Sequence, residues 1–330
     1  MISNVLLSRL SPLWALVNGV ARPFLSRGAW RAPCPVISVG NIVAGGAGKT
    51  EVAAWLAARA QARGLRPVVA LRGYGRPALS QVGAWSDSAL AGRGRNFPDE
   101  ALVHLLRNPG VPVVVGAKRA EILQRFWNDI NPGLIILDDG FQHFAMIRDR
   151  DVLVHDFSVK DPLWRDFPGM LEGADVRLCL GATEGAAKVP AKWGAKPWVR
   201  ASYGLAGVRP SEAIWRAGAP QPLPGEALLF CGVGNPARVK ASVEAAGCSV
   251  RAMRPLADHV EYDGSALKEL GRWAQEQDPS GKLALLTTLK DAVKLQDDAA
   301  ATLGRPVFVL DAGLTFHENE ALLGAVLEGL

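Results

Sequence analysis

The chain has 330 residues, of which 49% are hydrophobic and 21% are charged. This composition is typical of a folded protein with room for one large α/β domain or two smaller ones, and it excludes a chain that is disordered throughout. The surplus of 37 Lys and Arg over 32 Asp and Glu suits an anionic partner, such as a phosphate group, a nucleic acid or an acidic membrane, without choosing among them.

Residues 1–31 form a basic, apolar segment with four arginines, and the first acidic residue of the chain is Glu51. The longest uncharged stretch after the first arginine covers residues 10–21, and a bilayer span needs about 20 apolar residues. No small-residue cleavage site follows it, so we do not expect a signal peptide. We expect a helix that lies in a membrane interface with its arginines on the headgroups, or a helix packed on the domain behind it.

From residue 35 onward, short β-branched runs alternate with helical stretches. Strands are predicted at 36–39, 68–71, 113–115, 134–137, 152–155 and 176–180, and helices at 49–63 and 117–130. A stretch rich in Gly, Pro and Ala, Gly204–Gly225, breaks this rhythm. The alternation then resumes with strands at 228–231, 250–253, 283–287 and 307–310 and helices at 236–246, 264–275 and 291–295. Such alternation predicts parallel sheets flanked by helices.

The strongest local motif is Gly45-Gly46-Ala47-Gly48-Lys49-Thr50, between a predicted strand and a predicted helix. Consecutive glycines let backbone N–H groups surround phosphate oxygens, and the helix N-terminus adds a positive partial charge. Lys49 adds a full charge, and the Thr50 hydroxyl is a ligand for Mg²⁺. The standard pattern also has a glycine where Val43 stands, so the match is partial. The alternative is a simple glycine turn.

A second motif follows the apolar strand at 134–137, which ends in Asp138 and Asp139. In P-loop proteins such a strand runs beside the phosphate loop, and its terminal Asp holds Mg²⁺ directly or through water. Because Gly140 follows, the two acids also favour a turn, and both interpretations can hold together. Gln142 and His143 come directly after and are predicted to point into the same cleft as substrate-binding residues.

These motifs predict an α/β protein with a P-loop NTPase-like parallel sheet. The expected parts are the N-terminal membrane-associated helical segment at 1–31, a P-loop domain at 32–205, a linker at 206–225 and a smaller α/β domain at 226–330.

Other charged residues follow strand ends, where the loops of an α/β sheet meet ligands. Arg72, Arg76 and Arg119 are hypothesised to hold phosphates of substrate or nucleotide, although ordinary basic turns remain the alternative. Asp99 opens a predicted helix, where acids are also common for dipole reasons alone. In the second half, Asp258 adjoins His259 and could tune its pKa, but a surface turn explains the pair equally well.

Together and in this order, the motifs resemble the tetraacyldisaccharide 4′-kinases, the lipid A kinases of Gram-negative bacteria. The strings that carry the resemblance are Gly40-Asn41 with the glycine loop, Arg72-Gly73-Tyr74-Gly75-Arg76, Asp99-Glu100, Asp138-Asp139-Gly140-Phe141-Gln142-His143, Gly232-Val233-Gly234-Asn235-Pro236, Asp258-His259 and Lys290-Asp291-Ala292-Val293-Lys294. The likeness covers nearly the whole chain. It departs where Glu51 replaces a common Pro and where Val260 replaces a frequent second histidine.

The resemblance implies transfer of the ATP γ-phosphate to the 4′-hydroxyl of a tetraacylated glucosamine disaccharide 1-phosphate, which gives lipid IVA. It also implies Mg²⁺ and a site on the cytoplasmic face of the bacterial inner membrane. Lys49 and Thr50 match the phosphate-loop positions, and Asp138 and Asp139 match the metal and active-site acids. Asp99 with His259 matches the pair that activates the sugar hydroxyl.

Two other function classes share part of these sequence features. A membrane-associated ATPase switch of the cell-division or partitioning type shares the glycine loop, but it carries a signature Lys where Ala44 stands. A nucleic-acid-binding module is suggested by interleaved basic and aromatic residues, because such residues can stack on bases. Those residues are Lys188, Lys192, Trp193, Lys196 and Trp198. No nucleic-acid fold pattern accompanies them, so we expect no nucleic-acid partner.

Overall fold

The computed structural model describes residues 4–73, 84–85, 98–159, 162–193, 195–214, 218–258, 260–296 and 298–330. The chain divides into two compact units, one formed by Met1–Ser202 with Phe316–Leu330 and the other by Tyr203–Thr315. This division differs from the predicted domains at two places. The predicted linker begins inside a strand, β8 (Val199–Pro210), and residues 316–330 belong with the first unit.

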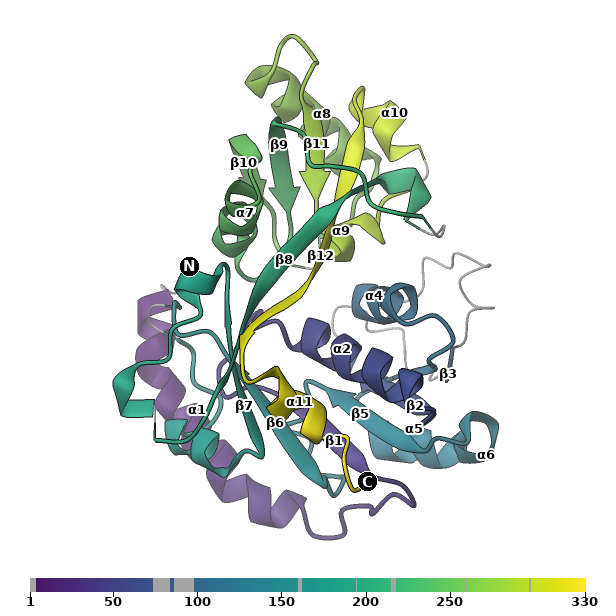
Figure 1. The fold of residues 1–330 in the computed structure, drawn as a ribbon, viewed down its shortest axis with the longest axis vertical. Coiled ribbons are helices and arrows are strands. Elements are labelled where there is room, and N and C mark those ends of the chain that lie inside the picture. The colour runs from purple at the N-terminus through teal and green to yellow at the C-terminus, as the bar shows by residue number, and fades with distance from the viewer. Residues whose placement is uncertain are drawn as a thin grey trace. The chain divides into compact units, whose positions relative to one another are not determined.

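The first unit contains a sheet with the strand order β8-β7-β6-β1-β5-β2-β4-β3 (Figure 1). Its other strands are β1 (Val36–Gly40), β2 (Pro67–Leu71), β3 (Ala84–Trp85), β4 (Val113–Val115), β5 (Leu134–Asp138), β6 (Arg150–His155) and β7 (Val176–Gly181). Neighbouring strands are parallel, except that β3 is antiparallel to β4. The predicted parallel sheet is therefore confirmed.

Helices pack on this sheet because its strands present apolar side chains on both faces. The described helices of the first unit are α1 (Asn4–Leu25), α2 (Lys49–Ala62), α4 (Asp99–Arg107), α5 (Arg119–Arg125), α6 (Trp127–Ile130) and α11 (Glu320–Ala325). Alternate residues of one face, such as Val36 and Ile135, bury Ile122 and Leu123 of α5. Helix α2 packs on β1, β2 and β5. The helix predicted at 117–130 is two helices, because the chain leaves helical geometry at Phe126.

Strand β1 lies at the point where the strand order reverses. It pairs with β5 on one side and with β6 on the other. The chain leaves β1 toward β2 in one half of the sheet, and it leaves β6 toward β7 in the other half. In open parallel sheets, ligands bind at the carboxyl ends of the strands beside such a reversal. The segment that follows β1 is the glycine loop, and the fold therefore places this loop at the expected position of a ligand site.

The second unit is a smaller α/β layer with the order β10-β9-β11-β12-β8, in which β10, β9, β11 and β12 are parallel. Its further elements are β9 (Glu226–Cys231), α7 (Pro236–Ala245), β10 (Ser249–Pro255), α8 (Gly264–Gln277), β11 (Ala284–Thr287), α9 (Leu289–Ala292), α10 (Ala299–Leu303) and β12 (Val307–Glu318). Helices α8 and α10 cover one face, and α7 covers the other. Short 3-10 turns occur at Pro168–Gly173, Glu184–Ala186, Ala191–Trp193 and Ser211–Ala213.

Residues after 315 return to the first unit and pack on α2. The ring of Phe316 lies 5.1 Å from that of Trp55, and Glu320 Oε1 accepts a hydrogen bond from Arg59 Nη2 at 2.7 Å. Figure 1 shows α11 beside α2. These contacts explain why the predicted boundary at 226–330 differs from the observed one: a contact between residues 261 positions apart leaves no local signature in the sequence.

Candidate active site

The glycine loop joins β1 to α2 and is shaped by two backbone positions that favour glycine. Gly45 has a φ of +113° and Gly48, which precedes the first residue of α2, has a φ of +88°. A Cβ added at Gly45 would meet nothing within 4 Å, so conformation and not space requires glycine there. Gly45 and Gly46 are exposed, and Lys49 begins α2. The first amides of α2 thus follow an open loop, an arrangement typical of phosphate binding.

The turn after β5 is fixed against the end of β1. Val39 and Asp138 are partners in the parallel ladder, and the Gly140 amide donates to the Val39 carbonyl at 3.1 Å. Gly40 approaches Phe141 so closely that a Cβ there would lie 2.4 Å from the Phe141 Cβ. This close approach brings the two acids beside the glycine loop.

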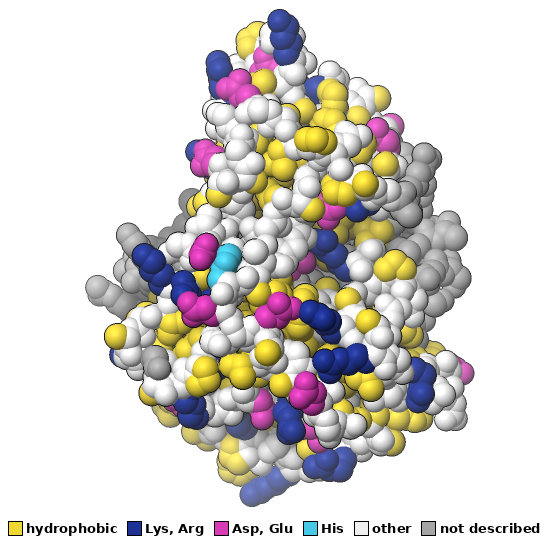
Figure 2. Space-filling view, in the orientation of Figure 1, with side chains coloured by type: hydrophobic (Ala, Val, Ile, Leu, Met, Phe, Trp, Pro, Cys, Tyr) yellow, Lys and Arg dark blue, Asp and Glu magenta, His cyan; other side chains and the backbone are white. Residues whose placement is uncertain are grey.

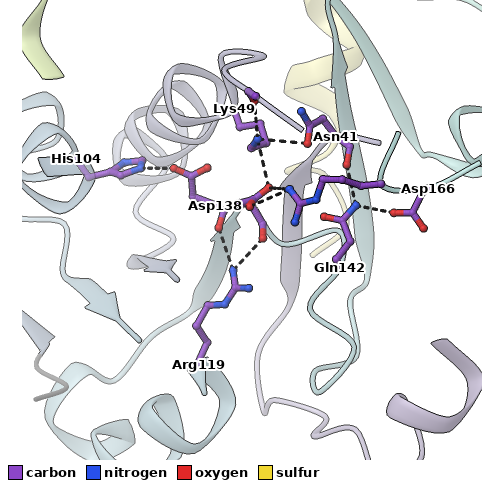
Figure 3. A network of polar contacts seen from close by, with 10 residues as sticks. Asn41, Lys49, His104, Arg119, Asp138, Gln142 and Asp166 are labelled. Carbon is purple, nitrogen blue, oxygen red and sulfur yellow. Dashed lines mark hydrogen bonds and ion pairs between the residues drawn. The ribbon is translucent and has the colours of Figure 1, made fainter. Parts of the chain in front are cut away.

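Lys49 is the point at which the loop and the acids meet. Its Nζ lies 3.3 Å from Oδ1 of Asp139, 3.3 Å from Oδ1 of Asn41 and 3.4 Å from the Gly45 carbonyl oxygen (Figure 3). Asp139 has a φ of +52°, a left-handed backbone that Asp adopts more readily than most residues. The structure therefore brings together the two motifs on which the P-loop interpretation depends.

A second cation holds the same carboxylate. Nη1 of Arg165 lies 3.1 Å and 3.2 Å from the two oxygens of Asp139. Burial alone would raise the pKa of Asp139, but Lys49 and Arg165, assisted by Arg119, outweigh burial and lower it to about 2. Asp139 is therefore a carboxylate at neutral pH, shared between two cations.

Asp138 has a different partner. Its Oδ2 lies 3.0 Å from Nε2 of His104, and both side chains are buried. His104 comes from α4, where it shares the buried face of the helix with Ala101 and Leu105. No sequence motif pointed to this histidine. The available signal was a histidine at i+3 from an apolar residue on the inner face of an amphipathic helix that opens with Asp99.

Comparison with known proteins decides the family. The sequence matches the family described as tetraacyldisaccharide-1-P 4′-kinase over residues 3–330. This chain belongs to that family. It is 31% identical to the tetraacyldisaccharide 4′-kinase of Chlorobaculum parvum over 324 residues, which cover 91% of this chain and 86% of the relative. It is 33% identical to that of Aeromonas hydrophila over 314 residues, covering 89% and 84%.

A solved structure of the tetraacyldisaccharide 4′-kinase family has the same fold. The crystal structure of LpxK from Aquifex aeolicus in complex with ATP aligns with a TM-score of 0.70 at 23% identity, over 97% of this chain and 98% of that one. At this identity the match supports the fold. The resemblance predicted from the sequence is confirmed by the family match and by the curated relatives.

Two residues predicted to bind substrate, Arg119 and Gln142, have internal partners in this 4′-kinase family member, and a third, His143, is buried. Arg119 is buried, and its Nη1 donates to the carbonyl oxygens of Asp138 at 3.0 Å and of Asp139 at 3.2 Å. Gln142 Nε2 donates to the Asn41 carbonyl at 2.9 Å. His143 is buried, and burial with nearby Arg119, Arg148 and Arg72 lowers its pKa to about 3. Arg119 and Gln142 thus hold the turn at residues 138–142, here called the acid turn, and the glycine loop in place.

The structure describes two of the four remaining predicted site residues. Asp99 is buried at the first turn of α4, and its Oδ1 accepts from the Glu100 amide at 2.9 Å. Arg72 is exposed just after β2. Arg76 and His259 lie outside the described residues.

In the second unit, the motif residue Asp291 joins two segments of the chain. The hydroxyl of Thr288 caps α9 by accepting from the Asp291 amide at 3.3 Å. The Asp291 carboxylate is fully buried and accepts from the Gly232 amide at 3.1 Å and from the Tyr262 hydroxyl at 2.9 Å. It therefore ties the loop after β9 to α9.

The aromatic residues that suggested nucleic-acid binding have structural roles. Trp198 is 4% exposed, and its Nε1 donates to the Trp193 carbonyl at 2.9 Å. Lys196 Nζ donates to the Glu172 carbonyl at 2.7 Å. On the face seen in Figure 2, Lys and Arg side chains lie among Asp and Glu side chains and do not form one continuous basic patch.

Proposed function

We propose that this family member is a tetraacyldisaccharide 4′-kinase, which transfers the γ-phosphate of ATP to the 4′-hydroxyl of a tetraacylated glucosamine disaccharide 1-phosphate and forms lipid IVA. The relatives that span most of the chain carry this name, and the Aquifex aeolicus structure that shares its fold contains ATP. The observation that carries the proposal is the 3.3 Å contact between Lys49 and Asp139, because it joins a phosphate-binding loop to a strand-end acid.

The nucleotide phosphates would lie on the exposed glycines Gly45 and Gly46, with Lys49 beside them. Phosphoryl transfer depends mainly on positioning and on stabilising charge on the phosphates. The resting partner of Lys49 is Asp139, so an incoming phosphate would compete with that carboxylate for the ammonium group. Arg165, which also contacts Asp139, would keep the carboxylate paired when Lys49 turns to phosphate.

The residues next to the loop suit Mg²⁺. Mg²⁺ prefers oxygen ligands and is usually held by one or two protein oxygens together with substrate phosphates. Thr50 on the first turn of α2 and Asp138 at the end of β5 offer a hydroxyl and a carboxylate on adjacent elements. When bound, the ion would neutralise charge on the transferred phosphoryl group. Asp138 would be held for this task by His104.

Asp99 is the proposed general base. A sugar hydroxyl has too high a pKa to ionise unaided, so a carboxylate within hydrogen-bond reach must take its proton as the phosphoryl group arrives. His259 would orient or tune Asp99, and Arg72 and Arg76 would hold substrate phosphates. These roles come from the family motif.

Helix α1 presents an apolar surface that suits a lipid substrate. Leu13, Val17, Val20 and Phe24 are each more than half exposed, and Gly19 lies against the exposed ring of Phe167. None of the described helices combines the length and apolar character that a membrane span requires. We infer that α1 lies on the cytoplasmic face of the inner membrane, where basic residues after it meet anionic headgroups.

The direct test incubates purified protein with labelled ATP, Mg²⁺ and the acylated disaccharide 1-phosphate in detergent micelles. A phosphorylated lipid that depends on all three supports the proposal, and Lys49→Ala should abolish it. ATP hydrolysis without a phosphorylated lipid would instead support the ATPase switch.

A further inference from the structure

Helix α1 reaches the active site through two side chains on its inner face. Nδ2 of Asn18 donates to the carbonyl oxygen of Arg165 at 2.7 Å. One turn later, Nη2 of Arg22 lies 3.0 Å from Oδ1 of Asp166. Two consecutive residues of a distant loop are thus fixed by two consecutive turns of α1.

The same two loop residues hold the active site from the other side. Arg165 contacts both carboxylate oxygens of Asp139. Asp166 Oδ2 accepts from Gln142 Nε2 at 2.6 Å, and that nitrogen also donates to the Asn41 carbonyl at the start of the glycine loop (Figure 3). The backbone amides of residues 165 and 166 both donate to the Ile42 carbonyl, at 2.8 Å and 3.2 Å.

Burial makes this connection sensitive to Arg22. Asp166 is 2% exposed, and a buried carboxylate is costly unless cations or donors surround it. Burial raises the pKa of Asp166, while Gln142 and Arg22 oppose that effect. The Arg22 guanidinium is itself fixed by the rings of Phe141 and Phe144, at 4.9 Å and 5.0 Å. The residue that neutralises Asp166 is therefore held against the turn that carries the active-site acids.

We propose that α1 is part of the phosphotransfer site: Asn18 and Arg22 are positioning residues that set Arg165 and Asp166 against Asp139 and Gln142. The inference rests on the proposed function and assigns α1 a role that is separate from lipid contact. Without Arg22 or Asn18, the loop at 165–166 loses one of its anchors and keeps those to Ile42 and Gln142, so Arg165 is held less firmly against Asp139. Lys49 then becomes the main cation for Asp139, and a nucleotide phosphate must break a stronger pair.

Two effects are expected in Arg22→Ala, measured in micelles with saturating lipid. By analogy with residues that orient catalytic groups, kcat falls about 10- to 100-fold. The dissociation constant of Mg·ATP, measured without lipid by titration calorimetry, rises severalfold. Arg22→Lys restores much of both values because it returns the charge to Asp166. Asn18→Ala, which removes one hydrogen bond at a half-buried position, shifts both values in the same direction by less.

The matched control is Arg59→Ala. Arg59 also pairs with a carboxylate, that of Glu320 at 2.7 Å, and lies 4.9 Å from an aromatic ring, that of Trp55, but it stands in the last turn of α2. It should leave kcat and the Mg·ATP dissociation constant unchanged. A double-mutant cycle between Arg22→Ala and Gln142→Ala should be non-additive for both quantities, since both side chains act on Asp166.

The outcomes test the positioning role of α1 and the kinase assignment separately. If the wild type makes the phosphorylated lipid but Arg22→Ala and Asn18→Ala keep its kcat and its Mg·ATP affinity, the role of α1 is refuted and the kinase assignment stands. If the wild type makes no phosphorylated lipid, the kinase assignment fails, and the Mg·ATP titrations still decide the role of α1. Should Arg22→Ala not fold, Asn18→Ala gives the same decision.

Discussion

Nε2 of His104 lies 3.0 Å from Oδ2 of Asp138, and both residues are buried, with 1% and 4% of their surfaces exposed. The pair joins α4, which begins with the proposed base Asp99, to β5, which ends with the proposed metal ligand. This contact therefore helps to set the distance between two functional groups, together with the packing of α4 on β4 and α2.

Replacing His104 should impair catalysis. His104→Ala leaves the buried Asp138 carboxylate without this partner, and we expect activity to fall about 10- to 100-fold, as for other residues that orient a metal ligand. His104→Gln keeps a side-chain donor on the same helix and should recover part of the loss. Steady-state kinetics at several Mg²⁺ concentrations test this prediction, and equal rates for His104→Ala and the wild type would contradict it.

Replacing Asp99 should separate chemistry from nucleotide binding. Asp99→Ala removes the proposed general base, a contribution typically worth about 10²- to 10⁴-fold in rate. The loss should appear in kcat, and the dissociation constant for ATP should stay near that of the wild type because Lys49 and the glycine loop remain. A mutant with the wild-type rate would refute the assignment.

The close approach of the acid turn to β1 predicts a large effect of one methyl group. In Gly40→Ala the new Cβ would lie 2.4 Å from the Phe141 Cβ and 2.9 Å from the Phe141 nitrogen. Overpacking of this kind costs about 1–3 kcal/mol in the free energy of unfolding, and the shifted turn should also lower kcat. Gly324→Ala, where a new Cβ meets nothing within 4 Å, is the control and should be neutral or slightly stabilising. Urea denaturation of both variants measures the difference.

Stability should fall on mild acidification because His155 is buried as the neutral imidazole. Burial lowers its pKa to about 4, although Asp156 opposes this effect. His155 takes up a proton below about pH 6.5 in the unfolded chain, but only near pH 4 in the folded chain. Its contribution to the free energy of unfolding is therefore fully present above pH 6.5 and is lost as the pH falls from 6.5 to 4. The full contribution is of the order of 3 kcal/mol.

His155→Gln cannot titrate and should therefore show a smaller loss of stability between pH 7 and pH 5 than the wild type. His143, whose pKa is lowered to about 3, still titrates in this variant, so part of the pH dependence of stability remains. Denaturation midpoints at the two pH values measure the effect, and parallel pH dependences of the two proteins would exclude His155 as a source.

The outer face of α1 should mediate binding to anionic membranes. Val17 is 57% exposed, so Val17→Glu places a charge in the apolar surface without disturbing a buried contact. We expect weaker co-sedimentation with phosphatidylglycerol vesicles and a stronger salt dependence of the remaining binding. Leu322→Glu, at an exposed position of α11, is the control. If both variants sediment like the wild type, α1 is not the membrane-binding surface.

The glycine loop and the acids of β5 could be predicted because their signals are local. A β-branched strand, a glycine turn and a helix start occupy adjacent residues, and parallel strands place their carboxyl ends at one edge of a sheet. The pairing of Val39 with Asp138 then follows from the fold.

The partners of the site residues could not be predicted in the same way. Arg165 contacts Asp139 across 26 residues, and Asn18 contacts Arg165 across 147. Such contacts depend on where whole elements pack, and no periodicity records them. Strand β8 was missed for another reason, because its glycines and its final proline are typical of a loop and its pairing with β7 stabilises it instead.

The return of residues 316–330 to the first unit has a consequence for biosynthesis. The ribosome synthesises the chain from its N-terminus, so the glycine loop and α2 emerge long before Phe316 and Glu320. Those two residues contact Trp55 and Arg59 of α2 in the folded protein. All of Tyr203–Thr315 must be translated in between. A nascent or prematurely terminated chain thus exposes one side of α2, and it would be a natural client for chaperones or proteases until the last segment arrives.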